Sequence, residues 1–183
     1  ILAQYLQERS PLPLHCFDTD AVNPTFSRWK ALNVETVKIL TEHNTIDTRP
    51  FDEMIESLVE LDGIGVIDNG AATFVPLIAY MNEGNIAELL KDNGVRVVMH
   101  VPMNGGQALG DCLAGLSQTL KNVDADVVVW LNDFKGAVHE GGKDFTDFKI
   151  YTQNKHRILG IVHLPNRNPD TFGKDIFLMT ENN

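Results

Sequence analysis

Cysteine is scarce in this chain, with only Cys16 and Cys112 among 183 residues. Two cysteines in two different predicted elements form neither a disulfide framework nor a metal-binding knuckle. We therefore expect two buried free thiols and a reducing compartment. The sequence also lacks an apolar run close to the roughly 18 residues of a membrane span, and nothing in it resembles a signal peptide. These absences predict a cytoplasmic protein.

Positive charge is in short supply as well. The chain has 15 Lys and Arg residues against 25 Asp and Glu residues, so its formal net charge is -10. This balance does not indicate contact with DNA or with an anionic membrane, although a local basic patch could override it. The 6 histidines show no metal-ligand spacing. No Gly-x-Ser-x-Gly elbow or Cys and His pair indicates a hydrolase nucleophile.

Length and composition suit one globular domain over residues 1–183. A chain of this size buries roughly two-thirds of its surface in one core, and 43% hydrophobic with 22% charged residues is ordinary for a globular protein. The chain opens on Ile1, and the stripe of Leu2, Tyr5 and Leu6 is typical of the second half of a helix. The final stretch, from Asp170 onward, is typical of a helix cut short. We therefore expect a domain truncated at both ends.

Short apolar runs alternate with helical stripes along the chain. The runs are apolar throughout instead of alternating with polar residues, which is typical of parallel strands covered on both faces. The predicted fold is therefore α/β with one mostly parallel sheet. Strands are expected at 14–17, 64–67, 95–101, 127–131 and 158–164, helices near 1–8, 25–32, 50–62, 74–81, 86–91 and 109–120, and no assignment is made for 33–47.

Polar residues close the predicted strands. In chain order, the strands end at Asp18 and Asp20, Asp68 and Asn69, Asn104, Asn132 and Asp133, and Asn166. Because the carboxyl ends of parallel strands meet at one edge, we expect these residues along the same edge. Three carboxylates from two strands predict a hydrated divalent cation, most naturally Mg²⁺, which needs few protein oxygens. Alternatively, each Asp or Asn is a turn former that caps the following helix.

Three motifs carry a family resemblance. FDTDAVN at 17–23 resembles the switch I motif of the ParA/MinD group of deviant Walker ATPases, VIDNGA at 66–71 resembles their Walker B strand with switch II, and VVVWLND at 127–133 resembles the strand that delivers an adenine-contacting Asn. The order of these motifs, together with GGQALGD at 105–111, is similar to ParA-like ATPases of conjugative plasmids over nearly the whole chain. The fold so implied is a three-layer P-loop NTPase-like domain.

The resemblance implies roles for four residues. Asp20 would be catalytic, orienting or activating the water that attacks the γ-phosphate of ATP. Asp68 would hold Mg²⁺ through a water, Asp18 would support that metal shell, and Asn132 would read the adenine edge. Phosphoryl transfer needs in-line positioning and charge neutralisation, so these residue types suit the reaction. Relatives also imply a nucleotide-dependent homodimer and a protein partner from the conjugation system.

The phosphate-binding loop of that family is absent from this sequence. It should be a Gly-rich turn ending in Lys and Ser or Thr, and neither Gly105-Gly106 nor Gly141-Gly142-Lys143 fits. The resemblance places the loop and its N-terminal strand immediately upstream of Ile1. Without that loop we expect this chain to bind ATP poorly and to hydrolyse none. The sequence thus predicts a switch ATPase of conjugative transfer that lacks its phosphate-binding loop; the alternative is a non-hydrolysing ParA-like interaction or scaffold protein.

Two further segments have open interpretations. Gly105 and Gly106, at a predicted helix start, could accept an anion or could make a tight strand-to-helix turn. The polar stretch 134–155 is too long for a simple connector. It could be a lid over nucleotide, a docking surface for an acidic partner, or an edge excursion with short structure of its own.

Overall fold

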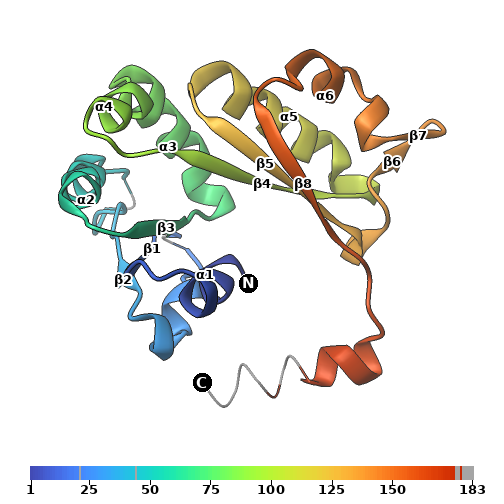
Figure 1. Cartoon of the computed structure of the whole chain (residues 1–183), viewed down its shortest axis with the longest axis horizontal. Coiled ribbons are helices and arrows are strands. Elements are labelled where there is room, and N and C mark those ends of the chain that lie inside the picture. Colours follow the sequence, from blue (N-terminus) through green and yellow to red (C-terminus); the bar gives the residue numbers. More distant parts are fainter. Residues whose placement is uncertain (21, 44, 176–177, 179–183) are drawn as a thin grey trace.

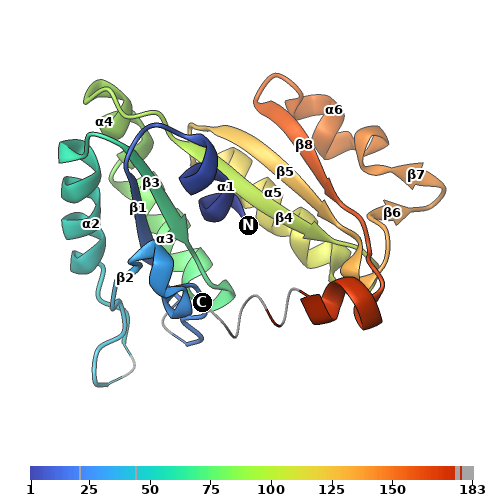
Figure 2. The same cartoon turned by 60° about the horizontal axis from the view of Figure 1, so that its bottom comes forward.

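Six strands form two separate parallel sheets in the computed structural model, which describes residues 1–20, 22–43, 45–175 and 178 (Figures 1 and 2). The first sheet has the order β2-β1-β3 and the second the order β4-β5-β8, and every pairing in them is parallel. The bounds are β1 Leu14–Asp18, β2 Glu35–Thr36, β3 Ile64–Asp68, β4 Val98–Asn104, β5 Asp126–Asn132 and β8 Ile158–Leu164. The α/β class with parallel strands is therefore confirmed. The expectation of one sheet with all strand ends along one edge is wrong.

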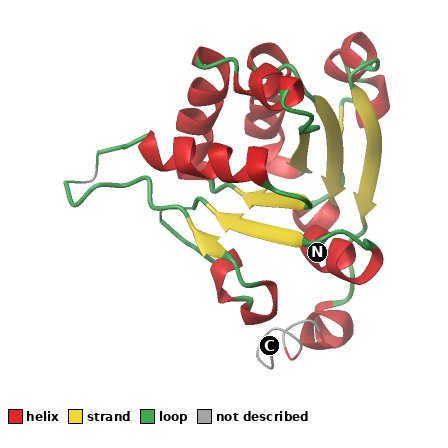
Figure 3. Cartoon of the chain, turned by 60° about the vertical axis from the view of Figure 1, so that its left-hand side comes forward, coloured by secondary structure: helices red, strands yellow, loops and turns green. Residues whose placement is uncertain are grey.

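Helices connect and cover these strands. Their bounds are α1 Leu2–Arg9, α2 Arg49–Glu60, α3 Ala71–Glu83, α4 Ile86–Asp92, α5 Leu109–Asn122 and α6 Lys149–Asn154. The helix α2 begins where the sequence predicts it, because Pro50 lies in the first turn and Asp52 complements the helix dipole there. Figure 3 shows the helices distributed around both sheets, whose strands run in different directions in that view.

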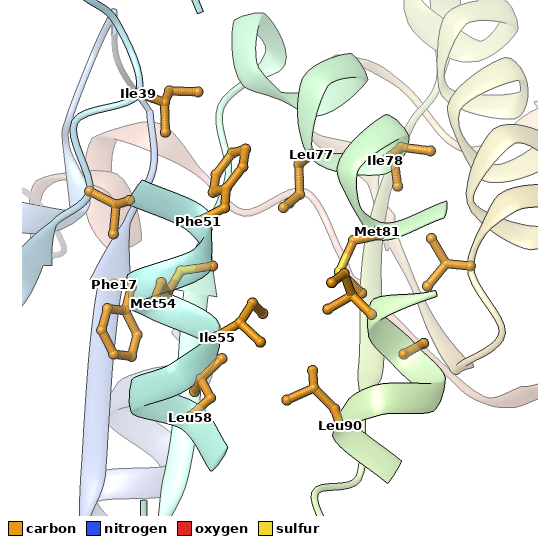
Figure 4. Close-up of a cluster of buried hydrophobic side chains, with 14 residues drawn as sticks. Phe17, Ile39, Phe51, Met54, Ile55, Leu58, Leu77, Ile78, Met81 and Leu90 are labelled. Atoms are coloured by element: carbon orange, nitrogen blue, oxygen red, sulfur yellow. The ribbon is translucent and has the colours of Figure 1, made fainter. Parts of the chain in front are cut away.

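The strand β1 is buried on both faces, at Cys16 and at Phe17. On one face, Phe17 belongs to a cluster of buried apolar side chains that α2, α3 and α4 also supply (Figure 4). On the other face, Cys16 packs with Ala3 of α1 and with Leu32. Helix, sheet and helix thus form three layers around β1, as the run of apolar residues predicts for a parallel sheet.

The second sheet carries its own core. Met103, Val127 and Val129 are buried with α5 residues such as Leu116. Met99 of β4 packs against both cores, so the two sheets share one continuous apolar interior. On the opposite face of β4, His100 and Pro102 are exposed. Cover on both faces is therefore confirmed for the central strand β1 of the first sheet, and not for β2, β3 or β4.

Each sheet has an edge strand that is free on one side. Within the described ranges, β3 pairs only with β1, and β4 pairs only with β5. In Figures 1 and 2 these two strands form the edges nearest to the other sheet. The apolar pattern of each run predicts a strand. Whether β3 pairs with β4 depends on long-range geometry, which that pattern does not contain, so the five predicted strands could divide between two sheets.

Three other segments differ in detail from the sequence prediction. The helix expected at 25–32 is instead two 3-10 turns, Phe26–Arg28 and Lys30–Leu32, with a non-helical ψ of 87° at Trp29 between them. The unassigned stretch 33–47 holds β2 and an isolated bridge between Leu40 and Ile46. Half of the stretch 170–183, where a helix was expected, lies outside the described residues, and its beginning belongs to a π-helical turn at Pro169–Gly173.

The polar stretch 134–155 is an ordered excursion from the sheet edge. It contains a two-stranded hairpin, β6 His139–Glu140 and β7 Lys143–Asp144, followed by a 3-10 turn and α6. Phe145 is only 1% exposed and stacks edge-on against Phe148 and Tyr151. The interpretation as an excursion with structure of its own is therefore confirmed. In the part of the chain that the structure describes, no helix combines the length and apolarity needed to cross a bilayer.

Candidate functional site

Three carboxylates gather where β1 and β3 end. Asp18 and Asp68 are register partners at the last position of the paired strands. Asp20 follows two residues later, and its carboxylate lies against the backbone of Gly70, directly behind β3. Desolvation raises the pKa of Asp68, and the negative charges of Asp18 and Asp20 raise it further. The structure thus brings together the three acidic residues that the sequence predicts at this edge.

Asp68 is the carboxylate whose environment disfavours its charge most clearly. Its side chain keeps access to solvent, yet the surrounding chain raises its pKa by desolvation, and the repulsion from Asp18 and Asp20 adds to that effect. A bound cation would relieve the same repulsion.

The chemistry of these residues suits a hydrated cation better than a bare one. Among the residues with described positions, no group of three or more His, Cys, Asp or Glu side chains is arranged to hold a metal ion directly. Mg²⁺ keeps several of its waters and needs only one or two protein carboxylates. Asp68, which remains solvent-accessible, is the residue that could contact such an ion through water.

Asp18 is fully buried, and it organises the loop behind β1. Its Oδ1 accepts a hydrogen bond from the backbone N–H of Asp20 at 3.0 Å, and its Oδ2 accepts one from the N–H of Ser27 at 2.9 Å. These bonds fix the loop at two points and hold the backbone at Ser27 in a short turn instead of the predicted helix. The turn-forming interpretation therefore describes Asp18 well, and its influence on a metal shell would be indirect.

Asp20 is held by its own loop. Its Oδ1 accepts hydrogen bonds from the N–H groups of Val22 and Asn23, both at 3.0 Å. Within the described ranges no donor contacts Oδ2, so one carboxylate oxygen stays available to a ligand or a water. A general base must reach the proton that it abstracts, and Oδ2 is the oxygen of Asp20 that could do so.

A buried hydrogen-bond network joins the loops behind β1 and β3. The side chain of Asn69 is its centre: Oδ1 accepts from the hydroxyl of Thr19 at 3.1 Å and from the hydroxyl of Thr73 at 2.8 Å. The backbone N–H and the hydroxyl of Thr19 also donate to the carbonyl of Asp68. Thr19 and Thr73 are 0% and 2% exposed. The loop that carries Asp20 and the first turn of α3 are therefore one connected unit.

Asn132 belongs to a different group, at the end of the second sheet. It is the register partner of Asn104, and its Nδ2 donates to Asn104 Oδ1 at 3.0 Å. Its Oδ1 caps the following turn by accepting from the N–H of Phe134 at 3.2 Å. Next to it, His163 Nε2 and Asp133 Oδ2 lie 2.7 Å apart. The structure therefore orders Asn132 in an amide pair, apart from the acidic residues of the first sheet.

Gly105 is explained by packing. A Cβ at this position would lie 2.2 Å from the carbonyl oxygen of Ala137 and 2.3 Å from that of Gly136, so only glycine lets the loops behind β4 and β5 meet. Gly106 adopts a positive φ of 65°. These constraints support the tight-turn interpretation of the glycine pair.

Known proteins match this chain over nearly its whole length. One, named Protein TraL and from Escherichia coli, is 40% identical over 182 residues, which are 98% of this chain and 75% of the relative. A second Protein TraL from Escherichia coli is 40% identical over 177 residues, which are 96% of this chain and 73% of the relative. The chain belongs to the TraL family. No family model matches it, and no solved structure does.

Sequence reasoning missed part of this TraL-family site. It singled out Asp18, Asp20 and Asp68, and the structure places these together. It did not assign Thr19, Asn69 or Thr73, although these residues connect the acidic loops of the TraL-family chain. The signal at Asn69 was its place beside Asp68 at a strand end, where the sequence left a turn-forming role open.

Proposed function

We propose that this TraL-family chain is the core of a cytoplasmic, Mg²⁺-dependent switch ATPase of the ParA/MinD type that acts in conjugative plasmid transfer. The observation that carries the proposal is the meeting of Asp18, Asp20 and Asp68 at the ends of β1 and β3. Adjacent carboxylates favour the cation that accompanies phosphate. The ParA/MinD assignment itself rests on the three motifs in the sequence.

Within this proposal, each acidic residue has a distinct task. Asp68 would hold Mg²⁺ through a water, and the ion would neutralise the charge that its neighbours concentrate there. Asp20 would use its free oxygen to orient or activate the attacking water, since its other oxygen is held by Val22 and Asn23. Asp18 would act through the loop, because both of its oxygens accept backbone N–H groups.

Asn132 would recognise the adenine base. Its Nδ2 uses one hydrogen for Asn104 and keeps a second, and its Oδ1 accepts only the N–H of Phe134 among the described residues. An amide with one donor and one acceptor position left can read the edge of a base. The resemblance supports this role, and the hydrogen bonds to Asn104 and Phe134 would hold the amide in a fixed orientation.

The phosphate-binding loop would come from a part of the native protein outside this sequence. The strands β3 and β4 are each unpaired on one side within the described chain, which leaves room in the pairing pattern for an added strand. The relatives are also longer than the match, which covers 75% and 73% of them.

We also propose that the native protein forms a homodimer in the presence of ATP and binds a protein of the conjugation system. Both proposals rest on the resemblance. Light scattering of the native protein with ATP and with ADP tests the first. A dimer that forms with ATP and not with ADP is expected, and equal masses under both conditions would contradict it.

The decisive experiment compares ATP hydrolysis by the native protein with and without Mg²⁺. We expect Mg²⁺-dependent turnover, and we expect the 183-residue chain alone to show none. In the native protein, Asp20→Ala should retain ATP binding and lose turnover by about 10²- to 10⁴-fold, the usual contribution of a general base. Unchanged hydrolysis in that variant would refute the role of Asp20.

The absence of a GK[ST] motif from this sequence favours a second candidate, a ParA-like scaffold that binds partners without turnover. The native coding sequence separates the two. A Gly-rich GK[ST] loop shortly before Ile1 supports the ATPase. A native protein without such a loop and without ATP binding supports the scaffold.

A further inference from the structure

Gly70 is a glycine that its backbone does not require. Its φ of -74° and ψ of 163° are extended values that any residue adopts. It occupies the N-cap position of α3, where Ser, Thr, Asp or Asn would stabilise the helix, and α3 has no side-chain cap. Conformation and helix capping therefore both favour another residue at this position.

The space around Gly70 gives the reason for the glycine. A Cβ at this position would lie 2.1 Å from Cγ, 2.2 Å from Oδ2 and 2.5 Å from Oδ1 of Asp20. All three distances are shorter than any normal contact of a Cβ. The carboxylate of Asp20 thus lies directly on the Cα of Gly70, in the place that a side chain would fill.

Neither partner of this contact can move aside easily. Asp20 is held by the N–H groups of Val22 and Asn23 at its Oδ1. The carbonyl of Gly70 accepts from the backbone N–H and the hydroxyl of Thr73, both at 3.1 Å, and from Asn69 Nδ2 at 3.2 Å. Thr73 is buried, so these bonds fix the start of α3.

We propose that Gly70 is a positioning residue. Because it has no side chain, it leaves a space against its Cα, here called the seat, in which the Asp20 carboxylate lies. The seat sets the place from which that carboxylate acts. The catalytic part of this inference rests on the proposed ATPase function; the seat itself does not. A side chain at position 70 would push the carboxylate out of the seat and break its bonds to Val22 and Asn23. If α3 moved relative to the loop behind β1 to make room for that side chain, the carboxylate would also leave its place against Gly70.

The stability test uses Gly70→Ala in two backgrounds of the native protein, with Asp20 present and with Asp20→Ala. The variant Asp20→Ala has no Cγ, so it removes the clash. Gly70→Ala should lower the melting temperature when Asp20 is present and should leave it unchanged or raise it in the Asp20→Ala background. A purely structural role of Gly70 would give equal losses in both backgrounds, and that result would overturn the inference.

The kinetic test measures kcat and KM for ATP in the same proteins, with Gly110→Ala as the control because no atom lies within 4 Å of a Cβ there. Gly70→Ala should lower kcat by about 10²-fold, as expected for a catalytic group displaced by about 1 Å, and should change KM little. In the Asp20→Ala background it should lower kcat no further. A kcat equal to that of the control would overturn the catalytic part.

Amide spectra separate a failure of this inference from a failure of the proposed function. In Gly70→Ala, the NMR signals of the Val22 and Asn23 amides should shift, because their acceptor is displaced, while Gly110→Ala should leave them in place. If these amides shift in Gly70→Ala and the unsubstituted native protein hydrolyses no ATP, the result supports the seat and refutes the ATPase. Unshifted amides would overturn the seat itself.

Discussion

The network around Asn69 can be tested by a double-mutant cycle with Thr19→Val and Thr73→Val. Valine has nearly the shape of threonine, so each change removes a hydroxyl without opening a cavity in this fully buried region. After Thr19→Val, Asn69 Oδ1 still accepts from Thr73, and the Asp68 carbonyl still accepts from the N–H of Thr19 at 2.9 Å. Because no acceptor loses its last partner, the loss is one net hydrogen bond, about 1 kcal/mol.

The same argument applies to Thr73→Val. Asn69 Oδ1 still accepts from Thr19, and the carbonyl of Gly70 still accepts from the N–H of Thr73 and from Asn69 Nδ2. A second loss of about 1 kcal/mol follows. The double variant has an additional cost, because Asn69 Oδ1 then has no donor among the described residues.

An orphaned acceptor adds about 1 to 3 kcal/mol. Asn69 is only partly buried, so the lower end applies and water can compensate in part. We therefore expect the double variant to lose about 3 kcal/mol where the two single losses sum to about 2. The coupling energy of about 1 kcal/mol is larger than the scatter of about 0.3 to 0.5 kcal/mol between independent sites.

Urea denaturation of the four proteins measures this coupling from the extrapolated free energies of unfolding. The matched control is Thr119→Val, which removes another buried hydroxyl, one that donates to the carbonyl of Gly115 at 3.1 Å. Thr119 and Thr19 share no partner, so that pair should be additive. Additivity between Thr19→Val and Thr73→Val as well would show that Asn69 does not join the two loops, and would refute the reasoning.

Three further predictions concern charge and packing. Because the charge of Asp20 raises the pKa of Asp68, Asp20→Asn should lower the pKa of Asp68 in an NMR titration, and an unchanged pKa would separate the two carboxylates. Partial desolvation of its ring lowers the pKa of His100, whose Nδ1 accepts from Trp130 Nε1 at 2.9 Å. Below about pH 6.5 the unfolded chain binds a proton at this residue before the folded chain does, so stability and the native tryptophan fluorescence should fall with acid there, and less so in His100→Asn. Phe145→Ala should cost about 3 to 5 kcal/mol in urea denaturation, whereas a detached lid would lose almost nothing.

Local pattern predicted most elements of this fold. The strand at Ile158–Leu164 was expected with the bounds that the structure has, and α2 begins beside the predicted Pro50. The helix expected at 25–32 failed because a buried carboxylate, Asp18, binds the N–H of Ser27 from nine residues away. Such a contact follows from the packing of β1, and the helical spacing of apolar residues does not predict it.

The sequence predicted the acidic residues of the candidate site better than it predicted the strand pairing and side-chain contacts around them. Spacing placed Asp18, Asp20 and Asp68 at strand ends, and parallel pairing of β1 with β3 then brings them together. The division of the strands between two sheets could not be read from the sequence, because each apolar run is compatible with either neighbour. The contact between Gly70 and Asp20 could not be predicted from the sequence either, since an Asn-Gly pair after a strand is equally typical of a plain turn.

The one-sided pairing of β3 and β4 has a consequence for the behaviour of this chain in concentrated solution. Each edge presents a row of backbone donors and acceptors, which is a template for pairing with another molecule. Self-association through these edges would grow with protein concentration and would be indifferent to nucleotide. The dimer of the proposed function would instead respond to ATP at fixed concentration, so the two kinds of assembly can be told apart by varying one quantity at a time.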